Sequence, residues 1–322
     1  MELDPDDPVL AVIAPPRLER FRALLGLRDD EAITADFSGW SKLVLLSDDL
    51  AILFPRDQTQ VEALDLEIEA LRTLERLGLA QVPQVVAVWN DPAVSANRVV
   101  VTRRLPGTML DQRIDEIDAE ELGGVLEQVA RLAACWHEVD PGPLVGRPDR
   151  RSAPHRTVDE LLSQHPSAPS ADDLAGRVGE RLELDAATRL AVAATLRHAR
   201  ALAPVVVHGD LHEGQILVDD DLRVTGIVDW QTARVAHPFT EFDLGEWGSG
   251  TWQVHRRAFP DLRRRQWDAY AIARGLPADL GPTFEIFWSL VHALRWPDSV
   301  YVGSEVTGTF AETRATLRQA LA

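Results

Sequence analysis

The segment His208–Gln215 constrains the fold most, because it lies between two short apolar runs while a third run ends just before Asp229. Runs of three to five apolar residues bounded by polar turns are typical of short buried strands. Such strands would deliver Asp210 and Asp229 to one place. Two carboxylates at the ends of apolar strands cost free energy unless a cation lies between them. A divalent metal bound to phosphates meets that requirement.

The spacing of the polar side chains indicates phosphoryl transfer. A loop aspartate, a carboxamide five residues later and a second aspartate after a strand pair form the arrangement of protein kinases. Asp210, Gln215 and Asp229 occupy these positions. Asp210 is the candidate catalytic base, which accepts or orients the proton of an attacking hydroxyl. Asp229 and Gln215 are the candidate Mg²⁺ ligands, and Asp229 would bridge the metal to nucleotide oxygens.

The strings HGDLHEGQ and IVDW, within 208–230, resemble the signatures of the aminoglycoside phosphotransferase-like kinases. That family also includes macrolide, choline, homoserine and other small-molecule kinases, and the resemblance extends over most of the chain. It implies an α+β, two-lobed, protein-kinase-like fold. Residues 1–104 would form a small β-rich nucleotide-binding lobe. Residues 105–322 would form a larger helical lobe for catalysis and substrate binding.

The same resemblance implies a set of nucleotide-binding residues in the first lobe. A small-residue loop would cover the phosphates, a helix glutamate would support them, and a hinge near 102–105 would meet the adenine through backbone groups. In this sequence these positions are Ser38, Gly39, Trp40, Ser41, Lys42, Glu67, Thr102 and Arg104.

Two positions depart from the family pattern. Gln215 stands where the family has asparagine, and the extra methylene strains a metal ligand because Mg²⁺ demands near-ideal octahedral geometry. Leu53 stands where the family has a phosphate-gripping lysine or arginine. Arg56 lies three residues farther on, so strict alternation points it to the opposite face unless Pro55 bends the strand.

Lys42 is the better replacement for the missing strand cation. It is the only lysine among 33 cationic residues, and it lies where the strand leaves the phosphate loop. The arrangement resembles the with-no-lysine protein kinases, in which the same loop region supplies the cation. Chance placement of a single lysine is the alternative, and whether Lys42 or Arg56 serves stays open.

Acceptor-binding candidates follow Asp229 in the second lobe. The resemblance places the acceptor near the catalytic aspartate, which suggests Glu241, Asp243 and Trp247. Asp243 could instead cap a following helix. Trp252, Trp288 and Trp296 could offer flat faces to a sugar, although tryptophan more often packs in a core.

Apolar patterning predicts the secondary structure of the remaining chain. We expect helices near 18–27 and over 61–77, 122–137 and 184–202; strands over 43–46, 50–54, 82–89, 98–102, 204–207, 216–218 and 224–228; a long surface loop over 147–173; and a largely helical stretch over 257–322.

Composition limits the partners and the location. A net charge of −18 argues against nucleic acid, whose phosphates require a basic patch. Cys135 is the single cysteine, so no internal disulfide can form. The acidic N-terminus lacks the basic start of a signal peptide, and no apolar run is long enough to span a membrane. We expect a cytoplasmic monomer or homodimer.

The expected function is transfer of the γ-phosphoryl group of ATP or GTP to a hydroxyl of a small molecule. An aminoglycoside or other antibiotic, a sugar or an amino alcohol would be the acceptor, and Mg²⁺ would be required. Two alternatives remain. The chain could be a nucleotide-binding pseudokinase that acts as an interaction module, or a metal-dependent hydrolase built on His208, Asp210 and His212.

Overall fold

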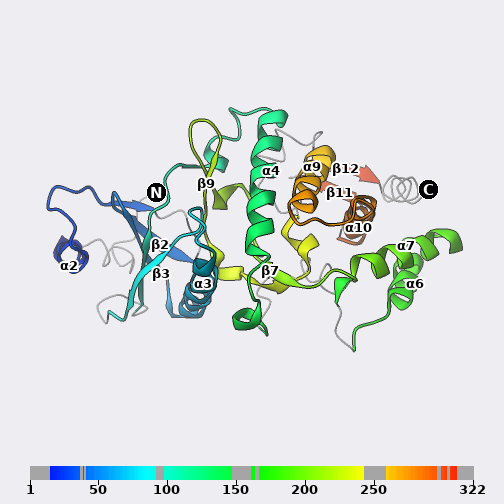
Figure 1. Ribbon diagram of the computed structural model, residues 1–322, viewed down its shortest axis with the longest axis horizontal. Coiled ribbons are helices and arrows are strands. Elements are labelled where there is room, and N and C mark those ends of the chain that lie inside the picture. The colour runs from blue at the N-terminus through cyan, green and yellow to red at the C-terminus, as the bar shows by residue number, and fades with distance from the viewer. Residues whose placement is uncertain are drawn as a thin grey trace. The chain divides into compact units, whose positions relative to one another are not determined.

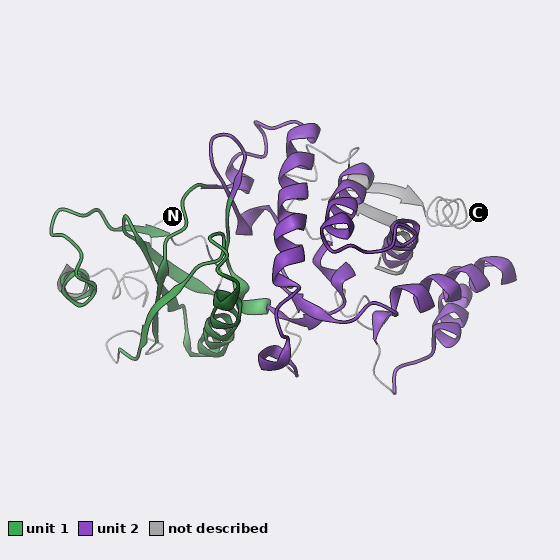
Figure 2. Cartoon of the chain, in the orientation of Figure 1, with its two compact units in different colours: residues 1–107, 225–232 green, residues 108–224, 233–322 purple. Residues whose placement is uncertain are grey.

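The computed structural model describes residues 15–36, 39, 41–91, 98–146, 161–163, 167–242, 259–295, 299–302 and 305–309. The chain divides into two compact units (Figure 2). The first unit comprises residues 1–107 and 225–232, and the second comprises 108–224 and 233–322. Sequence reasoning placed a single boundary after residue 104, whereas the contacts group 225–232 with the first unit. The first unit is built on a sheet and the second is mainly helical (Figure 1), so the fold is α+β.

The first unit contains a five-stranded antiparallel sheet with the strand order β1-β2-β3-β5-β4. The hairpin of the second and third strands confirms the two apolar runs predicted around a Ser-Asp-Asp turn. The short first strand was not predicted. The strands are β1 (Thr34–Asp36), β2 (Lys42–Leu46), β3 (Leu50–Pro55), β4 (Val85–Trp89) and β5 (Val99–Arg103).

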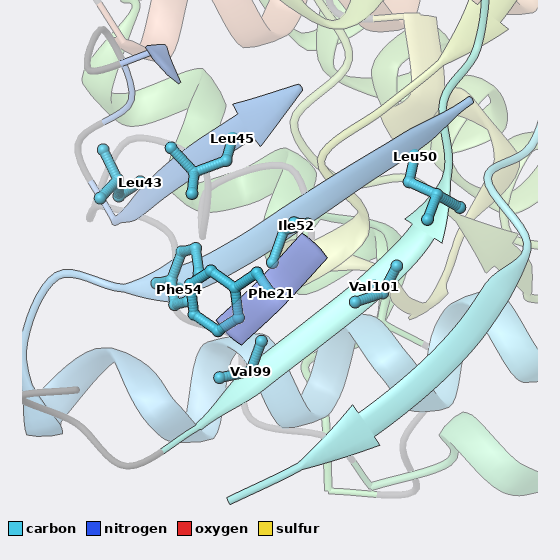
Figure 3. Close-up of a cluster of buried hydrophobic side chains, with 8 residues drawn as sticks. All are labelled: Phe21, Leu43, Leu45, Leu50, Ile52, Phe54, Val99 and Val101. Atoms are coloured by element: carbon cyan, nitrogen blue, oxygen red, sulfur yellow. The ribbon is translucent and has the colours of Figure 1, made fainter. Parts of the chain in front are cut away.

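Side-chain alternation gives this sheet two different faces. One face carries an apolar cluster to which Phe21, from helix α2 (Pro15–Leu25), also contributes (Figure 3). The other face packs Leu53 and Val100 against Leu64 and Ile68 of helix α3 (Val61–Leu74). The first cluster consists of Phe21, Leu43, Leu45, Leu50, Ile52, Phe54, Val99 and Val101.

Helix α3 has recognisable start and stop signals. Asp57 caps the 3-10 turn η1 (Gln58–Gln60), which leads directly into the helix. A second turn, η2 (Glu75–Leu77), follows the helix, and Gly78 ends it with a φ of 62°. Glycine takes this left-handed conformation with little strain. The helix predicted over 61–77 is thereby confirmed as one helix with a tightened last turn.

The first unit also includes the segment 225–232, which is far in sequence from residues 1–107. It includes most of strand β9 (Val224–Ile227) and the 3-10 turn η6 (Trp230–Thr232). The Ile227 N–H donates to the Gln81 carbonyl at 2.8 Å, and the buried Trp230 indole donates to the Ile227 carbonyl at 2.9 Å. These bonds hold the end of β9, and therefore Asp229, against the unit.

In the described part of the second unit, five helices dominate, with short strands between them. Strand β6 pairs with β8, and β10 pairs with β7, both antiparallel. The helices are α4 (Ala119–Trp136), α6 (Ala171–Arg181), α7 (Ala186–Ala199), α9 (Phe259–Ala273) and α10 (Leu280–Arg295). The strands are β6 (Thr108–Met109), β7 (Val205–Val207), β8 (Ile216–Val218), β10 (Arg234–Ala236), β11 (Ser299–Val302) and β12 (Glu305–Thr309), and the 3-10 turns are η3 (Leu110–Gln112), η4 (Gly142–Leu144), η5 (Glu213–Gln215) and η7 (Pro238–Phe242).

Aromatic side chains form the centre of the second unit. Trp267 stacks on Phe284 with ring centroids 4.6 Å apart, and Phe239 and Phe242 meet Trp267 edge-on. Trp288 is fully buried and touches Phe284, so it is a core residue rather than an exposed flat face. Trp252 and Trp296 lie outside the described residues.

Two expectations about the second unit were wrong in part, although helices α9 and α10 confirm most of the helical stretch predicted near the C-terminus. The predicted loop 147–173 ends inside α6, because Ser170 and Asp173 form a capping box that starts this helix. The predicted helical stretch 257–322 contains the antiparallel pair β11–β12. Valine, tyrosine and threonine in those strands favour a pleated surface over a helix. In the described part of the chain, no helix has both the length and the apolar character that crossing a bilayer requires.

Candidate active site

Lys42 lies on the α3 face of the first unit's sheet. In the β2–β3 register Lys42 is opposite Pro55 and Val44 is opposite Leu53, so all four side chains share one face. Leu43 and its neighbour Phe54 point to the other face, into the apolar cluster. Alternation therefore directs the single lysine toward helix α3.

Two carboxylates hold the Lys42 ammonium. Its Nζ lies 2.5 Å from Glu67 Oε2 and 2.7 Å from Asp229 Oδ1. Lys42 is 8% exposed and Glu67 is 4% exposed. Burial alone would lower the pKa of Lys42, but the charges of Asp229 and Glu67 outweigh it and hold that pKa above its usual value. The lysine is thus a permanent cation between a helix glutamate and the candidate metal ligand.

The backbone around Asp229 is specialised for this contact. Asp229 has a φ of 68°, a left-handed conformation that costs a non-glycine residue free energy and is often found at functional sites. The Trp230 N–H donates to Glu67 Oε1 at 3.3 Å, so Glu67 contacts both Lys42 and the turn that carries Asp229. The Gln231 amide donates to Asp229 Oδ2 at 3.5 Å.

Lys42 and Arg56, the two candidate phosphate-binding cations, make different contacts. Leu53 packs in the apolar layer beside α3. Arg56 donates through Nε to the Gly39 carbonyl at 2.7 Å, and its backbone N–H donates to the Ser41 carbonyl at 3.0 Å. Arg56 therefore contacts the carbonyls of Gly39 and Ser41, whereas Lys42 contacts Glu67. Ser38 and Trp40 lie outside the described residues.

The hinge residues are engaged within the sheet. Thr102 is buried and pairs with Ala51 and Val85. The backbone N–H of Arg104 donates to the Asp49 carbonyl at 2.9 Å, and its guanidinium donates to the Ser47 carbonyl at 2.6 Å. The Arg104 N–H consequently extends the β3–β5 pairing by one hydrogen bond.

In the second unit, strand β7 leads into the loop that carries Asp210. His208 is fully buried, and its Nδ1 accepts the Asp210 N–H at 3.4 Å. His212 Nδ1 accepts the Gly214 N–H at 3.1 Å and caps the turn η5. Among the described residues, no three histidine, cysteine or carboxylate side chains gather to hold a metal ion. Both histidines thus contact the loop backbone through Nδ1.

Gln215 has an oxygen suited to a metal. The residue is 8% exposed, and within the described part of the chain its buried Oε1 has no hydrogen-bond partner. A buried acceptor without a partner costs free energy, so it indicates an absent water or ion. A carboxamide oxygen is one of the oxygen ligands that Mg²⁺ accepts.

Of the acceptor candidates, only Glu241 lies within the described residues, since Asp243 and Trp247 do not. Glu241 is 3% exposed, and its carboxylate accepts the His208 N–H. Glu241 thus contacts the loop that carries Asp210 from the interior of the second unit, and its contact with an acceptor stays a prediction. The contact was not predicted from the sequence, because the two residues are 33 positions apart. The available signal was a carboxylate embedded in a short run of apolar residues after β10.

A model of the phosphotransferase enzyme family matches residues 32–282. One stretch of 39 residues is 51% identical to the uncharacterized protein YcbJ of Bacillus subtilis strain 168; it covers 12% of this chain and only 13% of that protein.

Solved structures resemble the chain over nearly its full length. The streptomycin–ATP–APH(2")-IIa ternary complex aligns with a TM-score of 0.50 at 13% identity, covering 99% of this chain and 97% of that chain. A choline/ethanolamine kinase family protein from Mesorhizobium loti aligns with a TM-score of 0.49 at 18% identity, covering 94% and 97%. At the identity of the ternary complex, the likeness shows a shared fold.

Proposed function

The chain belongs to the phosphotransferase enzyme family, and from that premise we propose that it transfers the γ-phosphoryl group of ATP or GTP to a hydroxyl of a small molecule. The observation that carries the proposal is the buried group of Lys42, Glu67 and Asp229. A lysine held by a helix glutamate is one of the parts that phosphoryl transfer requires in kinases. The second part is an aspartate at the metal, and Asp229 supplies it.

Each residue has a separate task in the proposed reaction. Lys42 would bind the nucleotide phosphates while Glu67 keeps its ammonium in place. Asp229 and Gln215 would hold Mg²⁺, which supplies neutralisation of the phosphate charge when bound. Asp210 would accept the proton of the acceptor hydroxyl as its oxygen forms the new bond to phosphorus. The bond between the γ-phosphorus and its bridging oxygen breaks, and the nucleoside diphosphate leaves.

The acceptor class is proposed from the fold neighbours and the charge of the chain. A neighbour whose complex contains streptomycin and ATP supports testing aminoglycosides first. A net charge of −18 is compatible with cationic guests. We include macrolides, sugars and amino alcohols, because the family fold hosts several acceptors.

A nucleotide-consumption screen tests this function. The full chain would be incubated with Mg²⁺ and either ATP or GTP, in the presence of each acceptor class, and diphosphate release would be measured. We expect one class to raise the rate above that of the acceptor-free reaction. Nucleotide binding without consumption across the whole panel would instead favour a binding module.

Gln215 provides a prediction that separates metal binding from stability. Gln215→Leu is expected to raise the Mg²⁺ concentration needed for half-maximal turnover roughly tenfold, as typical losses of one metal-supporting group are 10–100-fold. The unfolding midpoint should stay nearly constant, because Oε1 has no hydrogen bond to lose among the described residues.

Gln128→Leu is the matched control for Gln215→Leu. The Gln128 amide donates to the Leu222 carbonyl at 3.0 Å and accepts the Val224 N–H at 3.0 Å. Its loss should lower stability by about 1–3 kcal/mol, because buried partners are left unpaired, and should leave the Mg²⁺ requirement unchanged. An unchanged Mg²⁺ requirement in Gln215→Leu would remove Gln215 from the metal site.

A further inference from the structure

A buried carboxylate contacts the start of the loop that carries Asp210. Glu241 belongs to η7, whose five residues are all buried. Its carboxylate accepts the His208 N–H, at 2.8 Å to Oε2 and 3.2 Å to Oε1. Burying a carboxylate is unfavourable unless hydrogen bonds compensate for the lost water. Glu241 therefore needs these donors, and the loop backbone provides one of them.

Two side chains from the end of helix α4 supply further donors. The Trp136 indole N–H lies 3.5 Å from Glu241 Oε2, and His137 Nε2 lies 3.2 Å from the same oxygen. On its other side, His137 Nδ1 lies 2.8 Å from the Tyr270 hydroxyl of helix α9. The carboxylate thus joins two helices to the loop.

The protonation states of His137 and Tyr270 follow from their burial and their hydrogen-bond partners. Burial lowers the pKa of His137 and raises the pKa of the Tyr270 hydroxyl, so both groups are neutral near pH 7. A neutral Tyr270 donates its proton to Nδ1, and the imidazole then carries its own proton on Nε2 and donates to Glu241. In this series of hydrogen bonds, each donor is directed toward the Glu241 carboxylate. The carboxylate is thereby held in place to accept the His208 N–H.

We propose that Glu241 is a positioning residue for Asp210, an inference that rests on the proposed phosphotransferase function. His208 is two residues before Asp210, and its Nδ1 accepts the Asp210 N–H. Gly209 between them has a φ of 87°, so the loop turns sharply at this point. Fixing the His208 N–H therefore fixes where the loop begins and where Asp210 is presented.

The chemistry requires a carboxylate and not merely a polar side chain. A glutamine at 241 keeps the size but offers one acceptor oxygen and turns an NH₂ group toward a donor. With the amide oxygen at the Oε2 position, the NH₂ group faces the His208 N–H in place of Oε1. The uncharged amide oxygen also accepts from His208, His137 and Trp136 more weakly than a carboxylate does. A misplacement of about 1 Å in a catalytic group can cost about 10²-fold in rate. Glu241→Gln should therefore lower kcat by about 10- to 100-fold and leave the KM for the nucleotide unchanged, because Lys42, Glu67 and Asp229 are untouched.

Amide hydrogen exchange of the full chain tests the inference without relying on turnover. In Glu241→Gln, we expect exchange in a peptide covering 208–215 to be about tenfold faster, the factor expected for loss of one charge-assisted hydrogen bond. Glu285→Gln is the matched control, since Glu285 is a half-buried carboxylate of α10 that pairs with Arg263 at 3.6 Å. Exchange in 208–215 should not change in that control.

A second variant covers the case in which Glu241→Gln does not fold. Tyr270→Phe keeps the ring and removes only the outer hydroxyl, and it should raise exchange in 208–215 by a smaller factor of the same sign. Unchanged exchange in whichever variants fold would overturn the positioning role, whatever the turnover. If exchange in 208–215 is faster in Glu241→Gln but the wild-type chain consumes no nucleotide with any acceptor, Glu241 still fixes the loop and the proposed function is refuted instead. A higher KM for the nucleotide with an unchanged kcat would also overturn the role.

Discussion

Asp210→Asn is expected to lower kcat by about 10²- to 10⁴-fold, the usual contribution of a general base. Asparagine has the same size as aspartate but cannot accept the proton of the acceptor hydroxyl. The dissociation constant of the Mg²⁺–nucleotide complex should stay within about twofold of the wild-type value, because an interaction made only in the transition state does not alter ground-state binding. Steady-state kinetics and calorimetric nucleotide titration of the same preparation would measure both quantities.

Asp221→Asn is the matched control for Asp210→Asn. Asp221 is exposed in the turn after β8, where it pairs with Arg223. The kcat of the Asp221→Asn variant should equal that of the wild type. If Asp210→Asn retained full kcat with an acceptor that the wild type phosphorylates, Asp210 could not be the base and the assignment of the loop would be wrong.

Lys42→Met is the second change with a large expected effect. Removing one member of a buried ion pair typically costs about 3–5 kcal/mol, because the remaining charge is left without compensation. Here Glu67 and Asp229 would face each other without their shared cation. We expect the free energy of unfolding to fall by that order, and the affinity for Mg²⁺–nucleotide to fall at least tenfold. Denaturant titration and equilibrium binding would measure the two losses.

Arg56→Met distinguishes the two candidate cations. Its guanidinium contacts the Gly39 carbonyl rather than Glu67, so this variant should lose less stability and less nucleotide affinity than Lys42→Met. The reverse order would assign the phosphate contact to Arg56. In a Lys42→Met background, Leu53→Lys should recover part of both losses, because residue 53 shares the α3 face with residue 42.

The pH dependence of stability provides a further check on Lys42. Its pKa in the folded state is raised above the ordinary value of 10.5. A raised pKa means that the folded state binds the proton more tightly than the unfolded state does. The contribution of Lys42 to stability is therefore complete below about pH 10.5 and declines only as the pH rises through the folded-state value. Lys42→Met should abolish this alkaline decline in a series of unfolding experiments.

Local patterns predicted much of the fold. The β2–β3 hairpin and helix α3 follow from apolar runs, a turn and Gly78, all of which act within a few residues. The same holds for the strands around His208–Gln215. The capping box of α6 can be recognised in the sequence, but the proline and serine residues around it led to the prediction of a loop. Strand β1 has only three residues and depends on pairing with β2.

Contacts between distant residues could not be predicted from the sequence. Lys42 was a candidate because it is a lone lysine beside a small-residue loop. However, its bond to Asp229 joins residues 187 positions apart, and no local pattern encodes that pairing. For Glu241, the apolar residues around it indicate burial, but they do not show that its partner is the His208 N–H. The left-handed backbone of Asp229 likewise depends on its tertiary surroundings.

The grouping of residues 225–232 with the first unit has a consequence for biosynthesis. A ribosome releases the chain from its N-terminus, so β2 and α3 emerge long before Asp229 does. At about 5–20 residues per second, the delay between residues 107 and 232 is on the order of ten seconds. During that interval Lys42 and Glu67 would pair without their third partner. The nascent first unit thus stays incomplete until more than half of the second unit has been translated, and a fragment ending at residue 107 would lack Asp229, the proposed metal ligand.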